Sequence, residues 1–185
     1  MLMSDDDLRA ELDPPASIWR SLGGHRDAAV VVPLVRRTGV DHLLYVVRCD
    51  DLPHHAGEVA FPGGSREGNE TVEECALREL AEETGIQAQA VEILGSLPER
   101  TSGVGFRVHA MVARIDPPAH FTLDEVEIQS VVEVSVRDLA DDDQWQLRDV
   151  QGRTKVHRGV PFFPIGDRWL WGLTARFTQD LLARR

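Results

Sequence analysis

One segment, residues 64–86, constrains the fold of this 185-residue chain more than any other part. It reads Gly-Ser-Arg-Glu-Gly-Asn-Glu-Thr-Val-Glu-Glu-Cys-Ala-Leu-Arg-Glu-Leu-Ala-Glu-Glu-Thr-Gly-Ile. Residues 70–84 contain no Pro and no Gly, and a glycine follows them, as is common one position beyond the end of a helix. The pattern predicts a helix over residues 70–84, closed by Gly85.

The predicted helix carries three glutamates on one face. At about 100° per residue, Glu79, Glu82 and Glu83 fall within an arc of about 100°. No lysine lies three or four residues away to relieve their repulsion. Such a face is either simply solvated or binds cations. Ligands that are all oxygen atoms suit hard cations such as Mg²⁺ or Mn²⁺.

The spacing of the residues in this segment favours the cation site over the solvated face. The segment fits the pattern Gly-x5-Glu-x7-Arg-Glu-U-x-Glu-Glu-x-Gly-U, in which U is apolar, and thereby resembles the signature of the Nudix hydrolases. The resemblance implies an α+β fold, an α/β/α sandwich with a mixed central sheet and a loop–helix–loop catalytic motif. It also implies hydrolysis of a nucleoside diphosphate linked to another group. The matching residues are Gly64, Glu70, Arg78, Glu79, Leu80, Glu82, Glu83, Gly85 and Ile86.

The same resemblance implies roles for the signature residues. Glu79, Glu82 and Glu83 would bind Mg²⁺ or Mn²⁺, with the Gly64 carbonyl as a further ligand. Arg78 would pair with Glu70 and hold the helix against the loop, a supporting role within the catalytic set. The expected proton acceptor is either Glu83 or a glutamate on a later loop. Glu127 is the first candidate for that later glutamate, and Glu125 is its alternative.

A second element lies just upstream of the signature. It resembles the pattern Leu-Leu-Thr-x-Arg-(Ser or Ala)-x3-Arg-x3-Gly-x3-Phe-Pro-Gly-Gly of the coenzyme A pyrophosphatase branch. That branch would cleave coenzyme A or a derivative to 3′,5′-ADP and 4′-phosphopantetheine or its acylated form. The alternatives are hydrolysis of ADP-ribose, NADH or nucleoside triphosphates, and a Nudix-fold regulator without catalysis. The matches are Arg48, Gly57, Phe61, Pro62, Gly63 and Gly64; the departures are Tyr45, Val46, Cys49, Pro53 and Glu58.

Several residues are candidates for contact with such a substrate. The predicted substrate-binding residues are Arg48, His55, Gly57, Phe61 and Gly63. The 3′-phosphate of coenzyme A could meet a basic residue of the C-terminal region, although these residues could equally balance the acidic surface. Three tryptophans could stack on adenine, but packing is the favoured role for each. The basic residues are Arg153, Lys155, Arg158 and Arg168, and the tryptophans are Trp145, Trp169 and Trp171.

Charge and composition narrow the possible partners. The chain has 20 basic and 31 acidic residues, a formal net charge of −11. This charge disfavours nonspecific binding to nucleic acid or to an anionic membrane. Two cysteines and the absence of an apolar run near the roughly 20 residues of a membrane span predict a cytoplasmic protein. We expect a monomer or a homodimer.

The remaining pattern predicts one domain with an arm. Residues 1–27 are expected to form a partly disordered N-terminal arm with one short helix, and residues 28–185 the Nudix domain. Strands are expected near 28–36, 42–48, 91–97, 106–115 and 131–136, and a terminal helix over 174–184. Pro33 suggests that the first of these strands is at an edge or contains a bulge.

Overall fold

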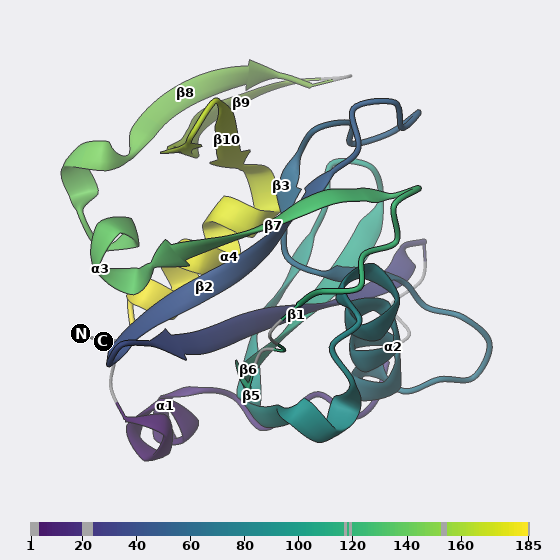
Figure 1. The fold of residues 1–185 in the computed structure, drawn as a ribbon. Coiled ribbons are helices and arrows are strands. Elements are labelled where there is room, and N and C mark those ends of the chain that lie inside the picture. Colours follow the sequence, from purple (N-terminus) through teal and green to yellow (C-terminus); the bar gives the residue numbers. More distant parts are fainter. Residues whose placement is uncertain (1–3, 20–23, 117, 119, 153–154, 185) are drawn as a thin grey trace.

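A computed structural model describes residues 4–19, 24–116, 118, 120–152 and 155–184. Its centre is a mixed sheet of seven strands, called the large sheet (Figure 1). The main order is β3-β2-β1-β6-β5, with β4 paired to β1 and β7 paired to β2. Among the described strands of this sheet, only β1 and β6 pair in parallel. The strands are β1 (Arg26–Arg37), β2 (Val40–Arg48), β3 (Val59–Ala60), β4 (Gly63–Ser65), β5 (Val91–Thr101), β6 (Phe106–Ile115) and β7 (Ile128–Ser135).

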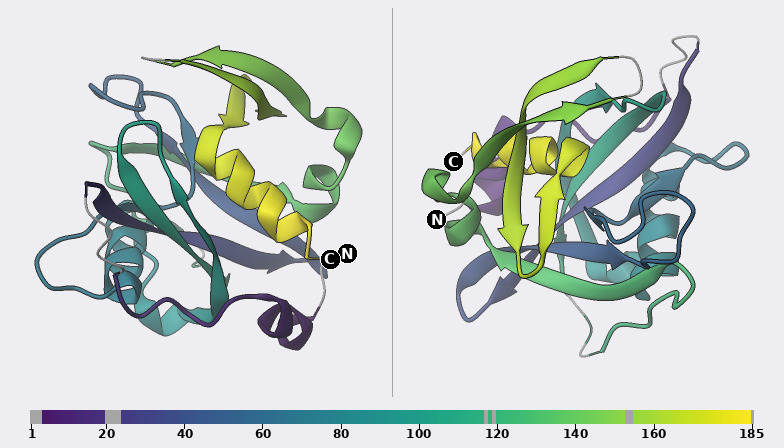
Figure 2. Two further views of the ribbon diagram at one scale, coloured as in Figure 1. Left: turned by 180° about the vertical axis from the view of Figure 1, so that it is seen from behind. Right: turned by 90° about the horizontal axis from the view of Figure 1, so that it is seen from above.

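Helices cover both faces of the large sheet. Helix α2 (Val72–Thr84) lies on one face and α4 (Gly172–Leu182) on the other, as Figure 1 and the view from behind in Figure 2 show. The strand β1 explains this arrangement. Ala29 and Val31 pack in the core beneath α2, whereas Val32 and Leu34 pack in the core that contains α4 residues. Because β1 is buried on both faces, its sequence is a continuous apolar run. The expected Nudix sandwich with a mixed sheet is confirmed.

The expectation that Pro33 marks an edge or a bulge is wrong, because β1 is a central strand and its register with β6 is continuous from Arg26 to Leu34. Val31 donates its N–H to Pro62 O, so the N of Pro33, two residues on, faces the same side of the strand. On that side β1 pairs with β4 up to Val30 and with β2 from Leu34 onward. The missing N–H of Pro33 therefore falls where β1 changes partners and no ladder bond is lost.

Helix α2 begins two residues later than expected, because Thr71 caps it. The Thr71 side chain accepts the Glu74 N–H, and the Glu74 carboxylate accepts the Thr71 N–H at 2.7 Å. Gly85 ends the helix with a left-handed φ of 76°. One face of α2 is buried against the sheet through Val72, Cys75, Ala76 and Leu80.

A smaller three-stranded sheet packs over the face that carries α4. It consists of β8 (Gln146–Gln151), β9 (Val156–Ile165) and β10 (Arg168–Trp171), and follows α3 (Val136–Leu139). Phe163 and Leu170 of this small sheet join the core formed with Phe177 and Leu181 of α4. In the described part of the chain, no helix is long and apolar enough to cross a membrane.

The described part of the expected arm lies against the domain. Helix α1 (Asp5–Glu11) buries Leu8, and Leu12 after it is also buried. A backbone bridge joins Asp13 to Ser96 of β5. The boundary expected at residue 28 falls inside β1, which begins at Arg26.

Candidate active site

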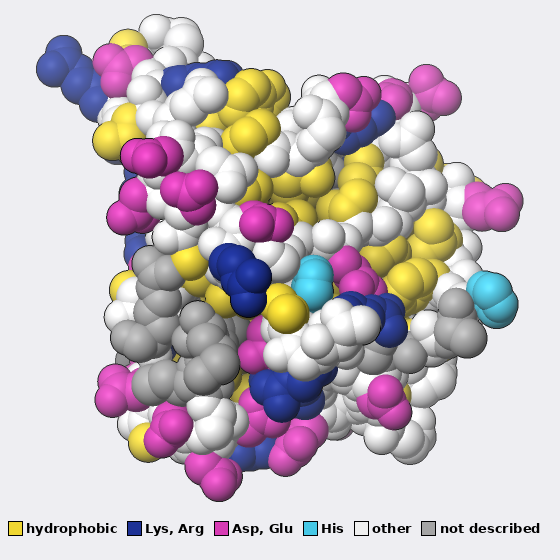
Figure 3. Space-filling model, turned by 60° about the vertical axis from the view of Figure 1, so that its left-hand side comes forward, with side chains coloured by type: hydrophobic (Ala, Val, Ile, Leu, Met, Phe, Trp, Pro, Cys, Tyr) yellow, Lys and Arg dark blue, Asp and Glu magenta, His cyan; other side chains and the backbone are white. Residues whose placement is uncertain are grey.

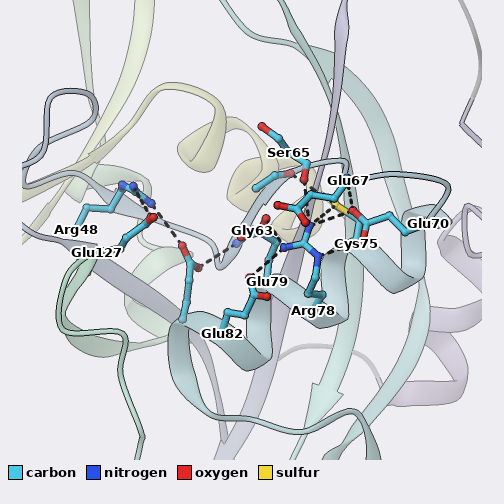
Figure 4. A network of polar contacts seen from close by, with 12 residues as sticks. Arg48, Gly63, Ser65, Glu67, Glu70, Cys75, Arg78, Glu79, Glu82 and Glu127 are labelled. Carbon is cyan, nitrogen blue, oxygen red and sulfur yellow. Dashed lines mark hydrogen bonds and ion pairs between the residues drawn. The ribbon is translucent and has the colours of Figure 1, made fainter.

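The C-terminal end of α2 brings Glu83 to the ends of β2 and β4. Glu83 Oε2 accepts the Gly63 N–H at 3.1 Å, and its Oε1 lies 3.4 Å from Arg48 Nη1. Arg48 Nη2 also donates to Glu127 Oε2 at 2.9 Å (Figure 4). Arg48 therefore joins a carboxylate of the signature to one that lies 44 positions further along the chain. The structure brings these predicted site residues together.

Arg78 is the centre of a second group of contacts, one helical turn earlier. Its guanidinium binds both Glu70 oxygens at 3.0 Å, which is the expected pair. Nη1 also donates to Glu79 at 2.9 Å and to Glu82 at 3.0 Å, and Nη2 donates to the Ser65 carbonyl at 3.1 Å (Figure 4). Arg78 thus supplies the positive charge between the glutamates that no lysine supplies.

Burial and pairing shift the pKa values of the signature carboxylates in opposite directions. The side chain of Glu83 is only 6% exposed, and this burial raises its pKa to about 8. Burial also raises the pKa of Glu79. The hydrogen bonds from Arg78, by contrast, lower the pKa of Glu70 to about 2. Glu70 is therefore a fixed anion, whereas Glu83 is a carboxylate whose charge is poorly compensated.

The side chains fit a hard cation by the chemistry of their donors. In the described residues no three acidic, His or Cys side chains form a ready-made metal site, because the signature glutamates turn toward Arg48 and Arg78. All four expected ligands are oxygen donors. Gly64 lies so close to Glu79 that a Cβ at this position would overlap the Glu79 carboxylate. The Gly64 carbonyl accepts the Cys75 thiol at 3.7 Å.

The expected substrate-binding residues fall into three groups. Arg48 and Gly63 contact Glu83, and Gly57 lies in the loop between β2 and β3. His55 lies in the same loop, half-exposed, with Nδ1 at 2.8 Å from Glu58. Phe61 is almost fully buried: the residue is 3% exposed, and its ring stacks on Tyr45 in the core that also contains residues of α4. This burial argues against a direct contact between its side chain and a substrate.

The basic residues of the C-terminal region, which were candidates for contact with a phosphate, differ in their surroundings. Arg168 is engaged by Asp50, the Gly57 carbonyl and Gln129. The exposed residues Lys155 and Arg158 lie at the start of β9, and Arg153 lies outside the described residues. On the face shown in Figure 3, acidic and basic side chains are interspersed, so the net charge of −11 does not make this face uniformly acidic.

The tryptophans mainly contact side chains of the protein itself. Trp145 packs on Phe163 and donates its indole N–H to Leu139 O at 2.8 Å. Phe162 stacks on Trp171 and meets Trp169 edge to face, and Arg148 covers Trp169. These contacts agree with packing as the favoured role.

Two supporting contacts could not be predicted from the sequence. Trp19 of the N-terminal region donates its indole N–H to the Glu70 carbonyl at 2.7 Å. Glu70 Oε1 accepts the Glu67 N–H at 2.6 Å. Both contacts hold the loop before α2. Between residues 64 and 71 the sequence shows only the spacing of the signature residues, and this spacing does not reveal either hydrogen bond.

Comparison with known proteins shows the family to which the chain belongs. The NUDIX domain matches residues 24–152, more than half of the chain. The uncharacterized Nudix hydrolase NudL of Shigella sonnei (strain Ss046) is 36% identical over 182 residues, spanning 97% of this chain and 93% of that protein. The protein of the same name from Escherichia coli O7:K1 is 36% identical over 165 residues, spanning 89% of this chain and 85% of that protein.

Solved structures share the fold. A MutT/nudix family protein from Enterococcus faecalis superimposes with a TM-score of 0.56 at 16% identity, covering 90% of this chain and 64% of that one. The Nudix hydrolase RenU from M. smegmatis gives a TM-score of 0.53 at 23% identity, covering 65% and 76%. With the complete signature in place on this fold, the chain belongs to the Nudix family and is a Nudix pyrophosphohydrolase.

Proposed function

We propose that this enzyme cleaves the diphosphate of coenzyme A or a derivative, releasing 3′,5′-ADP and 4′-phosphopantetheine or its acylated form. One observation carries the proposal. Arg48 and Gly63 belong to the element that resembles the coenzyme A pyrophosphatase branch, and both contact Glu83 of the signature, at 3.4 and 3.1 Å. Residues expected to bind the diphosphate therefore adjoin the carboxylates expected to hold the cation.

The side chains divide the work of this reaction. Glu79, Glu82 and Glu83, with the Gly64 carbonyl, would hold Mg²⁺ or Mn²⁺. When bound, the cation offsets phosphate charge and lowers the pKa of a coordinated water. Arg78 keeps Glu79 and Glu82 on one side of the helix through its 2.9 and 3.0 Å contacts.

The remaining roles belong to residues around Arg48. Glu83 or Glu127 accepts the proton of the attacking water, and Arg48, which reaches both carboxylates, orients a phosphate. Gly57 and the half-exposed His55 lie in the loop that would border the leaving group. A monomeric or homodimeric state and a cytoplasmic location stay predictions.

The substrate test is direct. Purified enzyme with Mg²⁺ is incubated separately with coenzyme A, ADP-ribose, NADH and deoxynucleoside triphosphates, and kcat/KM is measured for each. We expect the highest value for coenzyme A. A higher value for any other substrate would overturn the assignment to coenzyme A and leave the Nudix chemistry in place.

A non-catalytic regulator is the alternative of another class. All signature carboxylates are present, which supports catalysis. Glu82 is exposed, so Glu82→Gln is expected to keep the fold while it removes a ligand. Turnover should fall severely in this variant. Unchanged turnover would mean that the metal-site assignment is wrong.

A further inference from the structure

Arg168, in the small sheet, reaches across to the loop between β2 and β3. Its Nη1 donates to Asp50 Oδ1 and to the Gly57 carbonyl, each at 2.9 Å. Its Nη2 donates to Asp50 Oδ2 at 3.0 Å and to Gln129 Oε1 at 2.8 Å. Asp50 is 118 positions away in the sequence, so this contact depends entirely on the tertiary fold.

These contacts leave Arg168 little capacity for a ligand. A guanidinium has five N–H donors, and four bonds are already made to protein oxygens. Arg168 lowers the pKa of the Asp50 carboxyl, so Asp50 stays ionised and its negative charge offsets the charge of the guanidinium. Binding a phosphate would require Arg168 to give up bonds that it already has. Of the two roles that the sequence left open for Arg168, contact with a 3′-phosphate is therefore disfavoured.

The loop is shaped around the guanidinium. Gly57 has a left-handed φ of 65°, and a Cβ there would overlap both Arg168 Nη1 and Asp50 Oδ1. Glycine at this position thus lets the backbone carbonyl meet the guanidinium directly. Gly57 N–H in turn donates to Cys49 O at 3.2 Å, which closes the loop on the end of β2.

The same guanidinium also binds the strand that directly follows a candidate proton acceptor, Glu127. Gln129 lies two residues after Glu127, whose carbonyl accepts the Cys49 N–H at 2.8 Å. Arg168 therefore binds both the loop containing His55 and the beginning of β7, and the two segments meet at Cys49, next to Arg48.

We propose that Arg168 is a positioning residue that holds the loop of residues 50–57 and the Glu127 segment in the geometry needed for hydrolysis. It contacts no reacting atom and acts through Asp50, Gly57 and Gln129. The inference rests on the proposed roles of Glu127 and of the loop of residues 50–57, and not on the choice of substrate. If another diphosphate is the better substrate, the same loop and the same Glu127 are still required.

The test compares Arg168→Gln with a matched control. Arg100 and Asp180 form a similar bidentate pair, at 2.7 Å for both bonds, between β5 and α4, and share no residue with the site. Kinetics with Mg²⁺ and the wild type's best substrate are measured well below each melting temperature. We expect Arg168→Gln to lose about 10- to 100-fold in kcat/KM. Arg100→Gln should lower the melting temperature and keep kcat/KM within about twofold of wild type.

Two further measurements separate positioning from general destabilisation. Asp50 is 59% exposed, so Asp50→Asn is expected to fold, and its effect should not add to that of Arg168→Gln. Amide hydrogen exchange at Cys49 and Gly57 should accelerate in Arg168→Gln and not in Arg100→Gln, and this readout needs no substrate. Wild-type kinetics in both site variants, or equal kinetic losses in Arg168→Gln and Arg100→Gln, would overturn the proposal. Failure of the wild type to cleave coenzyme A would overturn only the proposed substrate.

Discussion

The two ends of α2 place glutamates of one signature in opposite environments. Near the N-terminal end, Glu70 receives both arms of Arg78 together with the Glu67 N–H, and its pKa falls to about 2. At the C-terminal end, Glu83 is buried and meets Arg48 only at 3.4 Å, and its pKa rises to about 8. The fully bonded carboxylate serves the fold, and the undercompensated one is suited to a cation.

The largest effect should come from removing the charge at the C-terminal end. Glu83→Gln keeps the size of the side chain but removes a carboxylate from the site. We expect kcat/KM to fall by about 10³-fold, a loss typical of an essential acid–base group. Glu73→Gln is the matched control, since Glu73 is exposed on the first turn of the same helix. Steady-state assays that gave both variants the same activity would contradict the comparison.

Magnesium should distinguish the two ends by thermal stability. Because binding to the folded state alone stabilises it, Mg²⁺ at 100 times its Kd should add about 2.7 kcal/mol to the free energy of unfolding. The increase should be small in Glu83→Gln and close to the wild-type value in Glu70→Gln. Thermal melts with and without Mg²⁺ measure this stabilisation, with protein made metal-free by a chelator as the reference. An equal shift in both variants would place the cation elsewhere.

Glu70→Gln should lower the free energy of unfolding more than it lowers the catalytic activity. The change breaks a bidentate, charged hydrogen-bonded pair that is 13% exposed on the Glu70 side. We expect a loss of about 2 kcal/mol in the free energy of unfolding. Urea denaturation of the metal-free protein measures it, with Glu73→Gln again as the control. If the urea midpoint of unfolding of Glu70→Gln equals that of the wild type, the Glu70–Arg78 pair does not stabilise the fold.

The smallest effect should be the pH dependence of the stabilisation that the Glu70–Arg78 pair contributes. The folded pKa of Glu70, about 2, lies below its ordinary value of 4.5. The unfolded chain therefore binds the proton more tightly. The stabilisation is complete above a pH of about 4.5 and is lost as the pH falls toward 2. The stability difference between wild type and Glu70→Gln should shrink from pH 6 to about pH 3. A difference that stayed constant or grew on acidification would contradict the pairing.

The parts of the site that the sequence predicts are those within one short segment. Arg78, Glu79 and Glu82 lie within five residues of one helix, so helical geometry is enough to bring them together. Glu70 lies in the loop before α2, and its pair with Arg78 is predicted only from the resemblance to the signature. The central position of β1 could not be predicted, since Pro33 argues for an edge until the change of partners is seen. An apolar strand buried on both faces does not reveal its neighbours.

The burial of Glu83 and the role of Arg168 lie beyond sequence reasoning. A glutamate on a polar arc gives no sign that Gly63 and Arg48 will enclose it. The contact of Arg168 with Asp50 spans 118 positions, and a basic residue in a basic region reads equally well as a phosphate ligand. Such contacts depend on how the small sheet packs against the rest of the domain, and no local sequence pattern predicts this packing.

The most direct test of this account follows the products of coenzyme A hydrolysis by mass spectrometry, for wild type and Glu83→Gln with Mg²⁺. The account predicts 3′,5′-ADP and 4′-phosphopantetheine in equal amounts from the wild type and almost none from the variant. Intact coenzyme A after incubation with the wild type would contradict the proposed substrate. Equal product formation by both proteins would contradict the assignment of the chemistry to the Glu83 end of α2.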